Sequence, residues 1–419
     1  MPTSKLSKWW KKVLLFLAVI GPGIITANVD NDPGGITTYS LAGAHYGYML
    51  LWTLIPITVA LIIVQEICAR MGAVTGKGLA DLIRENFGLR STFFMMAGLL
   101  FTNWANTVTE FAGVAAGAEI LGVSKYISVP LAAIFVWWLV VKGSYRRVEK
   151  VFLGASLFYI TYIISGFLAH PRWGDVFTQM IHPVGLTWNN ATMFMVIGMV
   201  GTTIAPWMQF YLQASIVEKG VTVKEYRISR WDVIVGCFVA TIVAFFIVAA
   251  CGATMFPRQI HIVDAHQAAQ ALGPLAGRYA RWLFAFGLLN AGIFAASILP
   301  LSTAYFICEG MGWESGVNKD WTEAPAFFTL YTALILFGSM VVLIPKISLV
   351  WLMVISQVLN GILLPIVLIY MLILANDKRL MGEYTNTPIF NWIAWITTVL
   401  MSGLSIALLV SALFPRIFS

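Results

Sequence analysis

The stretch "NVDNDPGGITTYS" (residues 28–40) places two aspartates, a proline and two glycines inside an apolar run of membrane-spanning length. A proline lacks a backbone donor and clashes with the carbonyl four residues earlier, so Pro33 should break a helix here. A carboxylate inside a bilayer is costly unless it faces a cavity or a partner. The stretch therefore predicts a broken membrane helix whose gap holds the side chains of Asp30 and Asp32.

The composition of the whole chain is that of a polytopic membrane protein. Of its 419 residues, 59% are apolar and only 11% are charged, whereas about 25% of a typical soluble domain is charged. The basic, aromatic start "MPTSKLSKWWKK" (1–12) runs into an apolar stretch without a small-residue cleavage site, so we expect a retained span. The four cysteines stand singly in or beside apolar segments, which favours buried thiols over a metal or redox site.

Eleven apolar segments have the length of about 20 residues that a helix needs to cross a bilayer. They lie at about 13–44, 48–69, 92–122, 127–142, 150–169, 190–217, 232–256, 281–308, 326–345, 347–375 and 390–414. The first and the sixth are interrupted. The whole chain, 1–419, is therefore predicted to be a single all-α transmembrane domain, with no soluble domain.

The basic residues indicate how the chain crosses the membrane. With a cytoplasmic amino terminus, the loops on the inner side contain 19 of the 26 lysines and arginines. This asymmetry follows the positive-inside rule and predicts a plasma-membrane protein with an extracellular carboxyl terminus. The net charge of +7 is then a signal of topology. We expect the lipid bilayer as a partner, no nucleic acid, and no obligatory protein partner.

The two interruptions occupy matching places in the chain. "NDPGG" (31–35) breaks the first segment, and "GTTIAPWMQFYLQ" (201–213) breaks the sixth. Five spans separate them, so the two halves would have opposite orientations, an arrangement typical of the midplane substrate site of transporters. We therefore expect inverted five-helix repeats at about 13–169 and 190–375, with an additional helix at about 390–414.

The aspartates of the first break favour a cation as substrate. No lysine or arginine lies mid-span to neutralise Asp32, so the missing positive charge is interpreted as the transported ion; the alternative is that Asp32 only caps a half-helix. Asp30 is either a second ligand or a cap of the unwound turn. At the second break, Thr202 and Thr203 add hydroxyls and the backbone adds carbonyls. Oxygen ligands without sulfur or imidazole suit Mg²⁺, Ca²⁺ or Mn²⁺.

The chain resembles the NRAMP family of divalent metal transporters along nearly its whole length. The shared stretches are "GPG" (21–23), "DPG" (32–34), "AGAHYGYMLLW" (42–52), "TEFAGVAAGAEILG" (109–122), the break in the sixth segment and "SQVLNGILLP" (356–365). The resemblance implies a LeuT-type fold with two inverted five-helix repeats, broken helices 1 and 6, and an eleventh helix. It also implies metal ligands at Asp32 and Gln357 and at backbone carbonyls near Val29 and Thr202.

The chain departs from the family pattern where that pattern supplies metal ligands. Gly35 stands in place of the family's asparagine. Ala205 and Trp207 stand in place of the methionine and histidine of the family's "MPH". Loss of the thioether removes a preference for soft transition metals, and the changes should widen the site and leave fewer direct ligands. Mg²⁺ dehydrates reluctantly and keeps several waters, so these departures favour a largely hydrated Mg²⁺.

The proton route implied by the resemblance is also altered. The family's Asp-x-x-Glu pair retains only Glu110, because Thr107 occupies the aspartate position. Glu110 is interpreted either as a residue that bonds locally or as one that moves ions. The arginine that the family usually carries in the ninth segment is absent, and all five histidines fall in or beside outer loops. These changes argue against obligatory proton coupling and leave Thr107 and Glu110 as a former proton path.

The sequence thus predicts uptake of Mg²⁺, with Mn²⁺ as a further substrate, by alternating access without proton coupling, as in the NRAMP-related magnesium transporter branch. The predicted metal-site residues are Asp32, Gly35, Thr202, Ala205 and Gln357, with Val29, Asp30 and Thr203 as secondary ones. No cofactor is expected beyond the transported ion.

Four other functions remain as alternatives. The first is a proton-coupled Mn²⁺/Fe²⁺ transporter of the ordinary NRAMP kind. The second is a transporter of an organic cation or amino acid, which Asp32 at the break disfavours. An ion channel would need a symmetric pore and a filter, and an intramembrane enzyme would need a motif such as HExxH or a Ser–Lys dyad. Neither feature is found in the sequence, so we expect no enzymatic activity.

Overall fold

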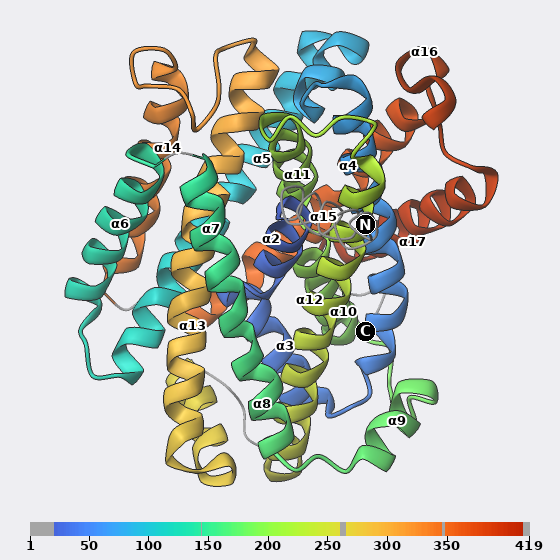
Figure 1. Cartoon of the computed structure of the whole chain (residues 1–419). Coiled ribbons are helices and arrows are strands. Elements are labelled where there is room, and N and C mark those ends of the chain that lie inside the picture. The colour runs from blue at the N-terminus through green and yellow to red at the C-terminus, as the bar shows by residue number, and fades with distance from the viewer. Residues whose placement is uncertain (1–20, 144, 260–264, 346–347, 414–419) are drawn as a thin grey trace, which may run out of the picture.

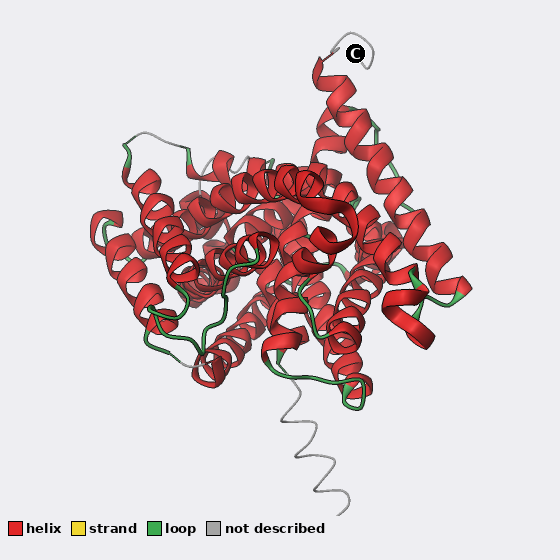
Figure 2. Ribbon diagram, turned by 90° about the horizontal axis from the view of Figure 1, so that it is seen from above, coloured by secondary structure: helices red, strands yellow, loops and turns green. Residues whose placement is uncertain are grey.

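The computed structural model describes residues 21–143, 145–259, 265–345 and 348–413, and these residues form a bundle of helices (Figures 1 and 2). The first half contains α2 (Pro22–Asn28), η1 (Val29–Asn31), α3 (Pro33–Tyr46), η2 (Leu51–Thr53), α4 (Leu54–Thr75), α5 (Leu79–Ile120), α6 (Lys125–Val141), α7 (Tyr145–Ser156), η3 (Leu157–Tyr159), α8 (Ile160–Leu168) and α9 (Trp173–Ile181). The second half contains α10 (Asn190–Thr203), α11 (Pro206–Glu218), α12 (Tyr226–Thr254), η4 (Phe256–Arg258), α13 (Ala265–Met311), α14 (Pro325–Leu343), α15 (Leu349–Asn376), α16 (Lys378–Met381), η5 (Gly382–Tyr384) and α17 (Pro388–Leu413).

Each of the eleven predicted apolar segments contains a helix of the structure. Within the described residues, eight helical stretches are long and apolar enough to cross a membrane, and α6 is a shorter apolar helix. The first part of the first predicted segment, 13–20, lies outside the described residues. The prediction of an all-helical polytopic membrane protein is confirmed.

Both predicted helix breaks are present. α2 ends at Asn28, and after η1 the chain is extended at Asp32 (φ −65°, ψ 170°) before α3 begins at Pro33. α10 ends at Thr203, and α11 begins at Pro206. Each proline is the first residue of the second half-helix, where its missing N–H leaves no hydrogen bond unmade. The two prolines thus start new helices after each gap.

The two broken helices lie in the interior of the bundle. α2 and α3 occupy its centre in Figure 1, where they contact α10, α12 and α15. The long helices α5 and α13 pack along each other beside them. α6 and α17 lie at opposite edges, and α17 projects from the bundle in Figure 2. The gaps between half-helices are therefore surrounded by other helices.

Two elements begin earlier than the apolar pattern predicts. α5 begins at Leu79, well before the predicted span at 92–122, and Gly88 joins this early part of the helix to the span. The φ of Gly88 is 80°, in a region that favours glycine, so the helix bends there without strain on a side chain. α13 begins at Ala265, well before the apolar segment at 281. Apolar content therefore marks the membrane-spanning part of a helix and misses its polar extension.

A buried carboxylate fixes the beginning of α2. Asp232, on α12, is fully buried, and its Oδ2 accepts hydrogen bonds from the backbone N–H groups of Gly23 (2.7 Å) and Gly21 (3.1 Å). The backbones of the two helices are close here, because a Cβ at Gly23 would lie 2.6 Å from the Val233 nitrogen. The first half-helix is thus held against α12 at its amino terminus, where an anion is favoured.

A second buried ionic group connects α4 to the segment before α17. Arg70 pairs with Glu66 at 3.2 Å, and the two side chains are only 8% and 5% exposed. Arg70 also donates to the carbonyl of Tyr384 (2.7 Å) and to the side chain of Asn386 (2.5 Å), while the Tyr226 hydroxyl donates to Glu66. This group holds the chain that leads into the peripheral helix α17.

Candidate cation site at the broken helices

Asp32 is the centre of the candidate site. It caps the amino terminus of α3, and its Oδ1 accepts a 2.5 Å hydrogen bond from the Gly35 N–H. The residue is only 4% exposed, and none of the ion pairs among the described residues involves it. Asp32 therefore caps α3, and its carboxylate lacks a cationic side-chain partner among the described residues.

Gln357 lies beside Asp32, as the resemblance implied. Its Nε2 is 3.5 Å from both carboxylate oxygens of Asp32, and the residue is 1% exposed. The close approach depends on Gly34, because a Cβ there would overlap the amide nitrogen of Gln357. The structure therefore brings together α3 and α15 at the residues predicted as ligands.

The carbonyl groups of the first break also reach this region. The Asp30 carbonyl accepts a 3.4 Å hydrogen bond from the Thr202 hydroxyl, which connects η1 to α10. The Val29 carbonyl accepts the Asp32 N–H at 3.0 Å. The carboxylate of Asp30 is buried, and neither of its oxygens has a hydrogen-bond partner. Asp30 therefore adds a second uncompensated carboxylate next to Asp32.

Gly35 lies where three oxygens converge. A Cβ at this position would lie 2.7 Å from the Thr202 hydroxyl and 3.3 Å from Asp32 Oδ1, and still closer to the Asp30 carbonyl. The expectation that loss of the asparagine side chain widens the site is therefore not met in this conformation. Here glycine permits close approach of the oxygens and leaves no empty volume beside its Cα.

Two other predicted site residues are placed at the second break. Ala205 is the residue before α11, is 2% exposed, and carries no group that can bind a metal through its side chain. The Thr203 hydroxyl donates to the Met199 carbonyl and pairs with the Tyr39 hydroxyl, both at 2.6 Å. Thr203 therefore directs its side chain to α3 and to its own helix, whereas Thr202 faces the first break.

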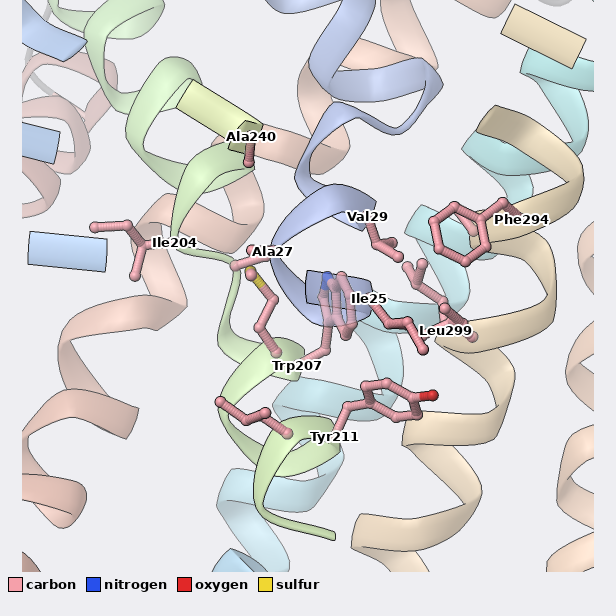
Figure 3. Close-up of a cluster of buried hydrophobic side chains, with 14 of the residues drawn as sticks. Ile25, Ala27, Val29, Ile204, Trp207, Tyr211, Ala240, Phe294 and Leu299 are labelled. Carbon is pink, nitrogen blue, oxygen red and sulfur yellow. The ribbon is translucent and has the colours of Figure 1, made fainter. Parts of the chain in front are cut away.

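Trp207 belongs to an apolar cluster next to the site. Figure 3 shows its indole among Ile25 of α2, Val29 of η1 and Leu299 of α13. The side chain is 1% exposed, and its ring centroid is 6.3 Å from that of Tyr211. A tryptophan is larger than the histidine of the family pattern, so this position too is filled in the present conformation. Through this cluster the half-helices α2 and α11 pack against each other.

The residues of the former proton path lie on α5. Glu110 is fully buried, and its carboxylate lies next to that of Asp32. Thr107 donates to the Asn103 carbonyl at 2.8 Å. Among the described residues, no group of three or more His, Cys, Asp or Glu side chains is placed to hold a metal ion. A cation next to Asp32 would accordingly bind neutral oxygen ligands as well as carboxylate oxygens.

Sequence reasoning missed Asn106, a fully buried residue of α5 that belongs to the polar surroundings of Gln357. Its amide bonds to Asn360, which in turn bonds to Gln357. A signal was present in the sequence, since Asn103, Asn106 and Glu110 follow a spacing of three and four that places them on one helix face. Polar residues on one face of an apolar helix indicate a buried polar contact.

Comparison with known proteins supports the family resemblance. A family model described as "Natural resistance-associated macrophage protein-like" matches residues 23–411. The divalent metal cation transporter MntH of Klebsiella pneumoniae subsp. pneumoniae is 27% identical over 405 residues, which are 95% of this chain and 95% of the relative.

Solved structures show the same fold. A manganese transporter of Eremococcus coleocola matches with a TM-score of 0.78 at 19% identity, over 99% of this chain and 90% of that one. MhsT in complex with L-phenylalanine matches with a TM-score of 0.60 at 13% identity, over 95% and 98% of the two chains. At these identities the likeness concerns the fold alone, and it is the LeuT-type fold that the sequence predicted.

Proposed function

The chain belongs to the NRAMP family, and from this membership we propose that it transports divalent metal ions across the cell membrane by alternating access. We further propose Mg²⁺ as the preferred ion, with Mn²⁺ as a second substrate, and a mechanism that does not require proton coupling. The amino terminus would be cytoplasmic and the carboxyl terminus extracellular, as the basic residues predict.

The observation that carries this proposal is the uncompensated carboxylate of Asp32 at the gap between half-helices. The residue is nearly inaccessible, yet among the described residues it has no cationic partner. A buried charge of this kind is costly unless a counter-charge arrives. A divalent cation would supply that charge and would draw on Gln357, Thr202 and the Asp30 carbonyl for further oxygens.

The chemistry of the ligands supports Mg²⁺ over softer metals. The groups next to Asp32 are a carboxamide, a hydroxyl and backbone carbonyls, which are hard oxygen donors. The side chain of Ala205 provides no sulfur ligand, whereas the methionine of the family pattern would. With so few protein ligands, waters would complete the octahedral shell that Mg²⁺ demands. Because the present conformation leaves no empty volume at Gly35, these waters would enter with the ion when the half-helices separate.

The membrane potential supports uptake without a proton. A divalent ion gains about 4.6 kcal/mol on moving inward across about 100 mV of inside-negative potential, twice the value for a single charge. Thr107 offers only a hydroxyl where the family pattern has an acid, and that hydroxyl is bonded to its own helix. The site therefore has an energy source for uptake that does not involve protons.

The alternative is proton-coupled Mn²⁺ transport. It is favoured by Glu110, a buried carboxylate next to Asp32, and by the manganese transporter among the structural relatives. A proton on Glu110 would relieve the cost of burying its charge, and its release could accompany metal movement.

A flux assay in liposomes tests the two mechanisms against each other. Purified protein is reconstituted with a Mg²⁺ indicator or a Mn²⁺-quenched dye and a pH dye inside, and Mg²⁺, Mn²⁺ or Ca²⁺ is added outside. We expect saturable Mg²⁺ and Mn²⁺ uptake with no change of internal pH beyond that of protein-free liposomes. Acidification that scales with metal uptake would establish the coupled alternative, and Mn²⁺ uptake with no Mg²⁺ uptake would refute the proposed selectivity.

A further inference from the structure

A chain of three buried amides extends from Asp32 to α5. Gln357 turns its Nε2 toward Asp32, and its Oε1 accepts a 3.1 Å hydrogen bond from Asn360 Nδ2. Asn360 and Asn106 form a reciprocal pair, in which each Nδ2 donates to the other Oδ1 at 3.0 and 3.3 Å. The three amides are 0–1% exposed, so water cannot substitute for a lost partner.

The orientation of Gln357 has a direct chemical meaning. The amide presents a donor to the Asp32 carboxylate, and in this orientation the N–H group takes the place of a positive charge. A cation would need the acceptor Oε1 instead, because a metal ion binds the amide oxygen and not its nitrogen. The 3.5 Å contacts to Asp32 are long, whereas the 3.1 Å bond from Asn360 holds Oε1 away from the site.

We infer that Asn360 and Asn106 are positioning residues that set the orientation of the Gln357 amide and turn with it when a cation binds at Asp32. The inference rests on the proposed function. When Gln357 turns its oxygen toward the ion, its Nε2 faces Asn360, which must then offer Oδ1 in place of Nδ2.

Because Asn360 and Asn106 bond to each other reciprocally, turning both amides costs little free energy. If Asn360 and Asn106 both turn by half a rotation, their two mutual hydrogen bonds form again with donor and acceptor exchanged. Asn360 then accepts from Gln357 through Oδ1, and no buried amide is left without a partner. A single asparagine with an apolar neighbour could not turn in this way, because its amide would lose its hydrogen bonds and remain buried without a partner. The pair thus provides two equally satisfied states, one for each orientation of Gln357.

Asn103 offers a matched control. It lies one turn from Asn106 on the same helix and is equally buried, but its Nδ2 donates to the Thr303 hydroxyl of α13 at 2.9 Å. Loss of this amide removes a comparable buried hydrogen bond without affecting the orientation of Gln357. If loss of any buried amide on α5 impairs transport, Asn103→Leu should impair it as well.

The test is a double-mutant cycle on Mg²⁺ uptake in liposomes, with half-saturating concentration and maximal rate measured separately. Asn360→Leu should raise the half-saturating Mg²⁺ concentration about five- to tenfold, the effect of one lost buried hydrogen bond. Asn106→Leu should raise it by a smaller factor, and Asn103→Leu should leave it unchanged. In a Gln357→Ala background, Asn360→Leu should have no further effect, because its partner is already absent.

The opposite results would overturn the inference. If Asn360→Leu raises the half-saturating concentration by the same factor in the Gln357→Ala background, or if Asn103→Leu has the same effect, the pair has no positioning role. Should Asn360→Leu not fold, Asn360→Ser, which still offers one donor and one acceptor, takes its place in the cycle. If liposomes that contain the wild-type protein take up neither Mg²⁺ nor Mn²⁺, the proposed function is refuted. If they take up the metal but the Asn360→Leu and Gln357→Ala effects are independent of each other, only this inference is refuted.

Discussion

At the scale of single residues, the absence of side chains is as important to the site as their presence. Gly34 leaves room for the Gln357 amide, and Gly35 lets the Asp30 carbonyl, the Thr202 hydroxyl and Asp32 approach one point. A backbone oxygen cannot move aside as a flexible side chain does. The two glycines are therefore requirements of the packing between α3, α10 and α15.

Gly35→Ala should destabilise the protein. Its Cβ would lie 2.7 Å from the Thr202 hydroxyl and closer still to the Asp30 carbonyl, so we expect a loss of about 1–3 kcal/mol from overpacking. A thermal melt in detergent would show this as a lower midpoint temperature. Gly403→Ala on α17 is the control, because a Cβ there meets nothing within 4 Å and alanine favours helix by up to about 1 kcal/mol. Similar midpoints for the two variants would contradict the prediction.

Asp32 has two roles that substitution can separate. Asp32→Asn keeps an oxygen that can accept the Gly35 N–H, so α3 should remain capped while the negative charge is lost. Asp32→Ala loses both and should cost about 0.5–2 kcal/mol of stability as well. We expect both variants to lose Mg²⁺ binding in calorimetry and uptake in liposomes, and only Asp32→Ala to lower the thermal midpoint. Unimpaired transport by Asp32→Asn would exclude this carboxylate as the metal ligand.

At the scale of secondary-structure elements, each half-helix has its own anchor. α2 has only seven residues, which is too short for a helix to be stable by itself. The Asp232 carboxylate accepts hydrogen bonds from backbone N–H groups at the start of α2. Close backbone contact with α12 determines which face of α2 packs against that helix. α2 therefore depends on α12 both for acceptors of its first backbone N–H groups and for the surface against which it packs.

Asp232→Ala should loosen α2 selectively. It removes the acceptor of the 2.7 Å and 3.1 Å hydrogen bonds from Gly23 and Gly21, so we expect faster amide hydrogen exchange over 21–28 and little change in α5. Asp232→Asn, which retains one acceptor oxygen, should have a smaller effect. Exchange in 21–28 that is the same in all three proteins would show that Asp232 does not anchor α2.

The Arg70 group should stabilise the region around α17 more than a surface ion pair does. Arg70→Ala leaves Glu66 buried without its cation, which costs about 3–5 kcal/mol for buried pairs. It also removes the donors to Tyr384 and Asn386, so limited proteolysis within 382–387 should accelerate.

The matched comparison for Arg70 is Glu85→Ala. This variant breaks the half-exposed pair with Lys77, where an effect of no more than about 1 kcal/mol is expected. A larger loss of thermal stability in Glu85→Ala than in Arg70→Ala would contradict the assignment.

The sequence predicted elements better than contacts. Pro33 and Pro206 mark both breaks because proline acts locally, on its own backbone and one turn upstream. The apolar segments mark the spans for a similar reason, since the bilayer imposes a length on each helix separately. In contrast, nothing near Asp232 in the sequence indicates that its carboxylate meets Gly23, more than two hundred residues away.

The candidate site was predictable in part for the same reason. Asp32 and Gln357 stood out as polar residues in apolar segments, and the structure brings them together. The filled surroundings of Gly35 and Trp207 were not predictable, because a residue type reveals the volume of its own side chain but not which neighbours occupy the remaining space. Asn106 was missed because its partner, Asn360, lies on α15, and the sequence of α5 does not reveal which helix its polar face meets.

At the scale of the whole molecule, a net movement of charge should accompany transport. If the ion crosses without a counter-moving proton, each cycle carries two positive charges inward. An inside-negative potential imposed with K⁺ and valinomycin should therefore accelerate Mg²⁺ uptake, and an inside-positive potential should slow it.

The response to potential also distinguishes the coupled alternative. The same uptake should be insensitive to a pH gradient imposed at constant potential. Acceleration by an inward proton gradient under these conditions would contradict the uncoupled mechanism.

The three amides next to Asp32 have an electrical consequence. Asn106, Asn360 and Gln357 are uncharged in either orientation, so their reorientation moves no net charge through the membrane field. Rotation of a neutral amide moves only a dipole, so it would contribute far less displacement charge than the entry of a divalent ion. Transient currents recorded while the site fills would therefore report mainly the ion. Loss of the Asn360 amide should raise the Mg²⁺ concentration at which these currents saturate and should leave the charge moved per ion unchanged.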